Sequence, residues 1–159
     1  MNLNNKNVII TGAAGGIGSA IVKKLLNLGA VVGVIDKDKN RLNLLEKSLT
    51  KLQKKKTIFF NVDVGKFDQV KSVVNKFFNK QKSIHALINN AAELIDGPLI
   101  GFSKGKLDKY SIEKWNKTLS SNLNGHFFVT REVVEKMTSS FTRGVVINIS
   151  SISAAGNRG

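Results

Sequence analysis

The sequence TGAAGGIG at residues 11–18 decides the fold of this chain. It follows a run of apolar and β-branched residues at Val8–Thr11 and leads into a segment at 16–28 whose apolar residues recur with helical spacing until Gly29. The sequence therefore predicts a strand, a tight glycine turn and a helix in direct succession. Such a unit is typical of a parallel sheet whose strands are joined by helices.

The rest of the chain continues this alternation of short apolar runs and longer helical segments, which is typical of a parallel sheet with helices on both faces. Right-handed crossovers then give an α/β fold, a Rossmann-type doubly wound parallel sheet of about five strands, whose switch point lies where the first and fourth strands diverge. The segment from Glu93 to Lys109, with the only proline, is predicted to be a loop. The expected strands are Val8–Thr11, Val31–Asp36, Thr57–Val62, Ala86–Asn89 and Val145–Ser150, and the expected helices are 16–28, 39–54, 67–81 and 112–138.

Composition narrows the class of protein. A length of 159 residues fits one domain, and 42% hydrophobic with 23% charged residues is ordinary for a globular chain. The absence of cysteine excludes disulfides and thiolate metal sites, and a reducing cytoplasm is the expected location. We expect no export signal and no membrane span, because no basic segment precedes an apolar run at the N-terminus and no apolar stretch approaches 18 residues.

The net charge of +14 raises the alternative of a nucleic-acid-binding protein. However, 21 of the 25 basic residues are lysines scattered through the predicted helices and loops, with one run at Lys54–Lys56. Stacking aromatic residues do not interleave with them, so we expect solvated helix faces and no nucleic-acid partner. His85 and His126 have no companion ligands at metal spacing, and no metal site is predicted.

The glycine turn has the spacing that a dinucleotide requires. A pyrophosphate binds backbone N–H groups at a helix N-terminus, where side chains would hold it away. Gly12 permits the tight turn, Gly16 lets the helix start approach the phosphates, and Gly18 lets helix and strand pack closely. The sequence therefore predicts a dinucleotide site.

An acidic residue at the end of the second strand indicates which dinucleotide binds. The carboxylate of Asp36, eighteen residues after Gly18, is placed to accept hydrogen bonds from the adenosine ribose and to repel a 2′-phosphate. NAD(H) is therefore favoured over NADP(H), although Lys37 and Lys39 could soften the repulsion. The alternative is that Asp36 is an ordinary helix cap.

The chain resembles the short-chain dehydrogenase/reductase family, and the similarity extends over its whole length. Ala92 replaces a glycine of the family's Asn-Asn-Ala-Gly motif. The matching segments, in order, are Thr11–Gly18, the acid Asp63 before Val64, Asn89–Ala92, Ser121–Gly125 after Trp115, and Asn148–Ser151.

The resemblance implies roles for individual residues. Ser151 would hydrogen-bond the substrate carbonyl or hydroxyl, and Asn122 would hold a water molecule in a proton relay. The implied cofactor-binding residues are Gly12, Ala14, Gly16, Ile17, Gly18, Asp36, Asp63, Val64, Asn89 and Ala91.

The family's Tyr-x-x-x-Lys pair does not follow Ser151 before Gly159. Tyr110 and Lys114 match the text of the motif but precede Asn122, and we interpret them as a helix-start region. We therefore expect residues 1–159 to be an NAD(P)-binding Rossmann domain from the N-terminal part of a longer member, with the C-terminal strands and helices missing. The strand at Val145–Ser150 would then be an exposed apolar edge.

The expected function is transfer of a hydride between NAD(H) and a small carbonyl or alcohol substrate. The long segment between Ala92 and Trp115 is similar to loops in relatives that act on sugars or sugar acids. Members of the family commonly form dimers or tetramers through the helix that corresponds to 112–138, and the resemblance therefore implies a homo-oligomer at full length. The alternative function is a non-catalytic dinucleotide-binding module, since the same fold serves many roles.

Overall fold

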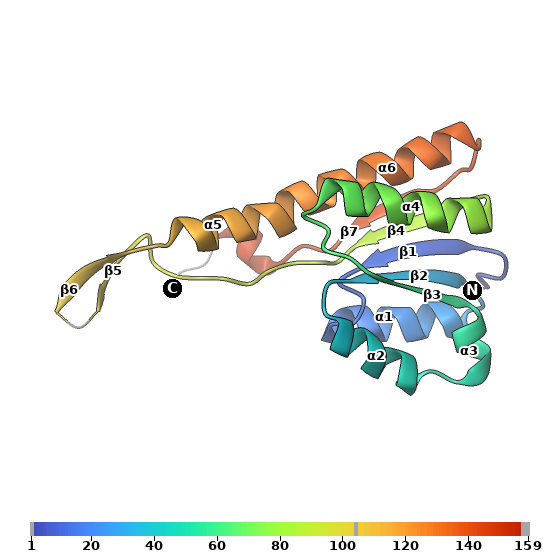
Figure 1. Ribbon diagram of the computed structural model, residues 1–159, viewed down its shortest axis with the longest axis horizontal. Coiled ribbons are helices and arrows are strands. Elements are labelled where there is room, and N and C mark those ends of the chain that lie inside the picture. The colour runs from blue at the N-terminus through green and yellow to red at the C-terminus, as the bar shows by residue number, and fades with distance from the viewer. Residues whose placement is uncertain (1, 104, 157–159) are drawn as a thin grey trace.

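A parallel sheet with helices on both faces forms the body of the protein (Figure 1), in a computed structural model that describes residues 2–103 and 105–156. The sheet has five strands in the order β3-β2-β1-β4-β7, and every neighbouring pair is parallel. The strands are β1 (Asn7–Thr11), β2 (Val31–Asp36), β3 (Thr57–Asn61), β4 (Ala86–Asn89) and β7 (Val145–Asn148). The predicted fold class is confirmed.

Two layers of helices sandwich this sheet. Helices α1 (Gly16–Asn27) and α2 (Lys39–Ser48) cover one face, and α4 (Phe67–Gln81) and α6 (His126–Ser139) cover the other (Figure 1). Alternate side chains of β1 enter the two apolar cores: Val8 and Ile10 pack towards α1 and α2, whereas Ile9 packs towards α4 and α6. Burial on both faces explains why the three central residues of the strand, Val8, Ile9 and Ile10, are all apolar.

The strand order reverses at β1. From this strand the chain proceeds to β2 and β3 on one side, and then returns to place β4 and β7 on the other. This is the predicted switch point, and the connections that leave the carboxyl ends of β1 and β4 diverge there to leave room for a ligand.

The expected helix at 39–54 is wrong in one respect, because it is two helices. The first is α2, and the second is α3 (Lys51–Lys55). Thr50 begins α3 with a reciprocal cap: its hydroxyl accepts from the backbone N–H of Gln53 at 3.3 Å, and the Gln53 side chain accepts from the N–H of Thr50 at 2.9 Å. A capping box of this kind satisfies two backbone donors and restarts the helix.

The expected helix at 112–138 is also interrupted. It consists of α5 (Ile112–Leu119), a wider π-helical segment η1 (Ser120–Gly125), and α6. The expected loop at 93–109 is wrong too, since it contains an antiparallel hairpin of β5 (Ile100–Ser103) and β6 (Lys106–Lys109) that extends away from the sheet (Figure 1). The π-helical segment escaped prediction because its apolar residues continue the helical spacing of α5 and α6. The hairpin escaped prediction because its strands are too short for a periodic pattern to be recognised.

The last strand is shorter than expected, ending at Asn148, and β3 likewise ends at Asn61. Among the described residues β7 pairs only with β4, and Val145 and Ile147 are 51% and 42% exposed. This is the apolar edge that the sequence predicts. A short 3-10 turn, η2 (Ile152–Ala155), follows it. None of the helices within the described ranges is long and apolar enough to cross a membrane.

His85, which precedes β4, makes the stability of the fold depend on pH. Its Nδ1 accepts a hydrogen bond from the backbone N–H of Asn7 at 3.0 Å. Burial, and secondarily the charge of Lys6, lower the pKa of His85 below its ordinary value of 6.5. The native state therefore binds fewer protons than the unfolded state, and the stabilisation present above pH 6.5 is lost as the pH falls towards the lowered pKa.

We expect urea denaturation to show a free energy of unfolding that decreases below pH 6.5. The variant His85→Asn should reduce this decrease, because an amide oxygen can accept from Asn7 without becoming protonated. An equally steep decrease in the variant and in the wild type would exclude His85 as its cause.

Candidate active site

The carboxyl ends of β1, β2 and β4 open into a cleft of about 610 Å³. The glycine turn, the end of β2, the segment after β4 and the α5–η1 region form its walls. Seven of the predicted cofactor-binding residues line it: Gly12, Gly16, Ile17, Gly18, Asp36, Val64 and Ala91. Its walls also contain Lys37, Asp38, Arg41, Asn90, Glu93 and Lys117.

The three motif glycines of the turn meet different surroundings. Gly12 has φ +59°, and a Cβ there would lie 2.7 Å from the Cα of Ala91. A Cβ on Gly18 would lie 2.2 Å from the carbonyl oxygen of Gly12, whereas a Cβ on Gly16 would meet nothing within 4 Å. Gly12 and Gly18 are therefore required by packing, and Gly16 leaves the start of α1 open to the cleft.

Hydrogen bonds join the glycine turn to the chain that leaves β4. The buried hydroxyl of Thr11 accepts from the backbone N–H groups of Asn90 and Ala91, each at 3.0 Å. The side chain of Asn90 donates in return to the carbonyl oxygens of Thr11 and Gly12 at 3.1 and 3.0 Å. Asn90 is a site residue that our sequence reasoning missed, although it lies between two residues that were named.

Asp36 is tied to the same turn. One carboxylate oxygen accepts from the backbone N–H of Ala14 at 2.9 Å, and the other accepts from the N–H of Asp38 at 3.0 Å. The residue that caps α2 is Asp38, whose side chain accepts from the N–H of Arg41. The alternative interpretation of Asp36 as an ordinary helix cap is therefore wrong.

The opposite wall depends on the π-helical segment. Asn122 holds the backbone of Glu93 with both ends of its amide: it accepts from the Glu93 N–H at 2.8 Å and donates to the Glu93 carbonyl at 3.0 Å. His126 contacts the carbonyl oxygen of Ala91 through Nε2 at 2.9 Å. Gly125 lies so close to Val64 that a Cβ would be 2.7 Å from its Cγ2. The segment is thus fixed against both the β3 and β4 ends.

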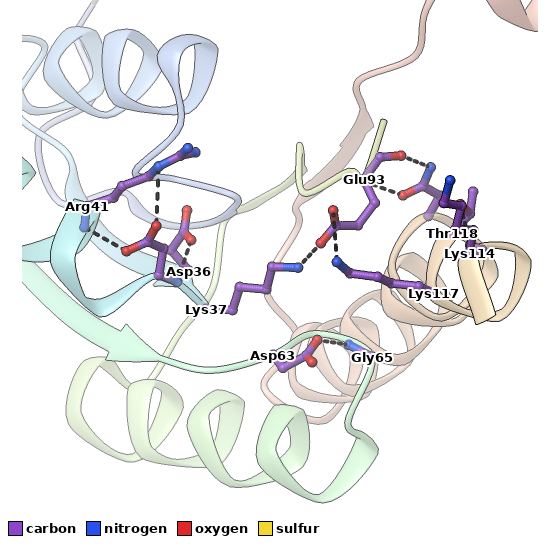
Figure 2. A network of polar contacts seen from close by, with 11 residues as sticks. Asp36, Lys37, Arg41, Asp63, Gly65, Glu93, Lys114, Lys117 and Thr118 are labelled. Atoms are coloured by element: carbon purple, nitrogen blue, oxygen red, sulfur yellow. Dashed lines mark hydrogen bonds and ion pairs between the residues drawn. The ribbon is translucent and has the colours of Figure 1, made fainter. Parts of the chain in front are cut away.

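Three predicted cofactor-binding residues do not line the cleft. Ala14 reaches it only through its bond to Asp36 and lines a smaller pocket instead. Asp63 accepts from the backbone N–H of Gly65 at 3.0 Å (Figure 2). The side chain of Asn89 is fully buried and donates to Thr130 and Asn148 at 2.9 and 2.8 Å. Asn89 therefore links strands β4 and β7 to α6 behind the cleft wall.

The residues with predicted catalytic roles lie at the same edge of the sheet. Asn122 comes from η1, and Ser151 is an exposed residue just beyond the carboxyl end of β7. Neither side chain is among those that line the cleft itself. Asn122 instead shapes the wall through the backbone of Glu93.

Tyr110 and Lys114 have the structural roles that their positions predict. The hydroxyl of Tyr110 donates to the carbonyl oxygen of Ile95 at 2.5 Å. This bond joins the segment before the β5–β6 hairpin to the segment after it. Lys114 lies in the first turn of α5, where its backbone N–H donates to the capping side chain of Ser111. This is a helix start, as expected.

Charged side chains surround the cleft in opposite pairs. Glu93 pairs with Lys37 and, at 4.0 Å, with Lys117 (Figure 2). Asp38 pairs with Arg41 at 3.3 Å. Asp38 and Arg41 are a local pair at the start of α2, whereas Lys37, Glu93 and Lys117 are far apart in the sequence and are brought together only by the fold. Within the described residues, no group of three or more His, Asp or Glu gathers to hold a metal ion.

The residues present fit a dinucleotide. The open start of α1 at Gly16 offers unobstructed backbone N–H groups and the positive end of a helix to a pyrophosphate. Asp36 places a carboxylate beside it for hydroxyl groups, and the 65% exposed side chain of Ile17 supplies an apolar surface. A polar, open cleft with these groups can bind an extended anionic ligand that has a sugar next to its phosphates.

Comparisons with known proteins agree with this chemistry. The short chain dehydrogenase family matches residues 6–158. The 3-oxoacyl-(acyl-carrier-protein) reductase of Chlamydia pneumoniae is 33% identical over 154 residues, which is 97% of this chain and 58% of the reductase. The chain thus spans little more than half the length of this relative.

Two solved structures show the same fold. NAD+-bound xylitol dehydrogenase superposes with a TM-score of 0.79 at 22% identity, over 99% of this chain and 57% of that one. ElxO with NADP bound gives a TM-score of 0.80 at 23% identity, over 96% of this chain and 58% of that one.

Alanine substitutions at Gly18 and Gly16 should show that the fold needs a glycine at the first position for close packing but not at the second. We expect Gly18→Ala to lower the free energy of unfolding by about 2 kcal/mol, because the new methyl overlaps a carbonyl oxygen in a close-packed turn. Gly16→Ala should stay within about 1 kcal/mol of the wild type, since it enters open space in a helix. Chemical denaturation measures both, and equal losses would contradict this division of roles.

Proposed function

This chain belongs to the short chain dehydrogenase family, and from this premise we propose that it binds NAD(H) as part of an oxidoreductase acting on a small carbonyl or alcohol substrate. The observation that carries the proposal is the pairing of an open helix start at Gly16 with the carboxylate of Asp36 in one cleft. When bound, the nicotinamide would supply or accept the hydride.

The phosphates are proposed to lie at the start of α1. Gly15 and Gly16 expose the backbone there, and the helix begins without a side-chain cap or an acidic residue in its first turn. These backbone donors therefore have no competing carboxylate on their own helix. An anion would replace water on them and gain from the helix dipole.

Asp36 is proposed to select NAD(H). Its oxygens already accept two backbone N–H groups, which fix the carboxylate in the cleft wall with lone pairs left for ribose hydroxyls. A phosphate in place of a hydroxyl would lose those bonds and meet a like charge. The two fold neighbours hold NAD+ and NADP respectively, so the fold alone does not decide the cofactor.

Ser151 and Asn122 are proposed to serve the reaction as the family resemblance implies. Ser151 would donate a hydrogen bond to the substrate oxygen from the end of β7. Asn122 would support a proton relay from η1, where its side chain also fixes the backbone of Glu93. A sugar-related polyol or ketone is the proposed substrate class, and the hairpin between β4 and α5 would lie near its entrance.

Self-association is proposed for the face of α6 that carries Phe127 and Val134. Their side chains are 62% and 41% exposed, and they line an apolar depression on that helix. A second copy would remove this surface from water.

The variant Asp36→Ala tests the ribose assignment. We expect it to weaken NADH binding about tenfold or more, because hydrogen bonds to a charged acceptor are lost. Calorimetric titration measures the affinity, and denaturation shows whether the protein stays folded without the tether to Ala14. Glu46→Ala, which removes an exposed carboxylate from α2, is the control for charge. Unchanged NADH affinity in Asp36→Ala would refute the assignment.

The variant Gly16→Val tests the phosphate site. A branched side chain at this open position should reduce NADH affinity by roughly two orders of magnitude, because it occupies the space nearest the backbone donors. The fold should survive, since nothing lies within 4 Å of that direction. Undiminished binding would contradict the proposed pose. A non-catalytic module would bind NADH in the same way, so ketone reduction has to be measured on a chain extended past Gly159 to include the family's Tyr-x-x-x-Lys pair. Turnover there indicates the enzyme, and NADH binding without turnover indicates the non-catalytic module.

A further inference from the structure

A chain of three charged residues crosses the cleft beside Asp36. Lys37, the next residue after Asp36, extends its ammonium to one carboxylate oxygen of Glu93, and Lys117 of α5 lies 4.0 Å from the other (Figure 2). All three residues line the cleft, and Lys37 and Glu93 belong to different walls.

Glu93 is held more firmly than an ordinary surface carboxylate. Its side chain is 19% exposed, against 51% and 60% for its lysine partners. Its backbone N–H and carbonyl are both bonded to the amide of Asn122. Because the acid is fixed and partly withdrawn from water, its pairing with a lysine costs less side-chain freedom than a typical exposed pair.

Arg41, a second cation of the cleft lining that follows Asp36 in the chain, is also paired with a carboxylate. The guanidinium of Arg41 lies 3.3 Å from one carboxylate oxygen of Asp38. The other carboxylate oxygen of Asp38 accepts a hydrogen bond from the backbone N–H of Arg41. Each described cation lining the cleft is therefore paired with a carboxylate, whereas the Asp36 carboxylate accepts only from backbone N–H groups. Among the described residues that line the cleft, no unpaired cation therefore accompanies the negative charge of Asp36 on the side proposed for the ribose.

We propose that Glu93 is a specificity-determining residue that excludes NADP(H) by keeping the ammonium of Lys37 away from the ribose. This inference rests on the proposed binding of NAD(H) with its ribose at Asp36. A 2′-phosphate placed there meets the carboxylate of Asp36, and Lys37, the cation that follows Asp36 in the chain, is held across the cleft by Glu93. Asp36 and Glu93, on different walls of the cleft, thus both favour NAD(H) over NADP(H).

Removal of the Glu93 carboxylate should have two effects on a 2′-phosphate. Lys37 becomes able to turn towards the phosphate next to Asp36, and one negative charge leaves the cleft. NADH carries only hydroxyls on this ribose. It gains only from the loss of one negative charge in the cleft, which slightly favours its pyrophosphate. The ratio of the two affinities therefore isolates the effect at the ribose.

The test is Glu93→Gln, which keeps the size of the side chain and leaves the backbone bonds to Asn122 in place. We expect the affinity for NADPH relative to NADH to rise about fivefold at low ionic strength, as one ion pair near a surface becomes available to the phosphate. Calorimetric titration of the full chain with each nucleotide gives the ratio. The gain should shrink as salt is added.

Two further variants complete the experiment. Glu135→Gln makes the same change in net charge on α6, where Glu135 pairs with Lys136 at 3.5 Å outside this cleft, and it should leave the ratio unchanged. In the double variant Lys37→Gln/Glu93→Gln the ratio should return to the wild-type value, because the released cation is gone.

Each opposite result overturns the inference. An unchanged ratio in Glu93→Gln removes the role of Glu93, and an equal rise in Glu135→Gln assigns the effect to net charge alone. A rise that persists in the double variant excludes Lys37 as the released cation. If the wild-type chain binds NADH but the ratio does not respond, only this inference fails, whereas binding of neither nucleotide overturns the proposed function with it.

Discussion

The backbone of Gly12 touches the backbone of Ala91, and the rest of the site depends on this contact. A single Cβ would not fit between them, and the hydroxyl of Thr11 together with the amide of Asn90 satisfies the backbone groups on both sides. Backbone groups at strand ends that are withdrawn from water need such partners. The contact therefore holds β1 and β4 together where their connections diverge, and it sets the floor of the cleft.

Polar links, rather than apolar packing, connect the walls above this floor. Asp36 binds the turn through Ala14, Asn122 binds the backbone of Glu93, and Glu93 reaches back to Lys37. The apolar cores lie below, on the two faces of the sheet, and supply the rigidity. A cleft built in this way can exchange its internal ion pairs and hydrogen bonds for those of a polar ligand without disturbing the core.

The strands and the switch point could be predicted because their signals are local or topological. Runs such as that of β1 are apolar on both faces, and the handedness of crossovers then restricts the strand order. The break between α2 and α3 had a readable signal in Thr50 and Gln53, which the helical spacing around them obscured. The β5–β6 hairpin and the π-helical segment had none, since their conformations depend on contacts made elsewhere in the chain.

The sequence by itself determined the glycine turn and the acidic end of β2, because steric limits on backbone conformation and the spacing of strand, turn and helix act within a few tens of residues. Only the tertiary structure decided that Asn90 closes the floor, that Asn89 turns away behind the wall, and that Glu93 meets Lys37. Those pairings join loops that follow different strands. Their partners are chosen by the order of strands in the sheet, which no local stretch of sequence encodes.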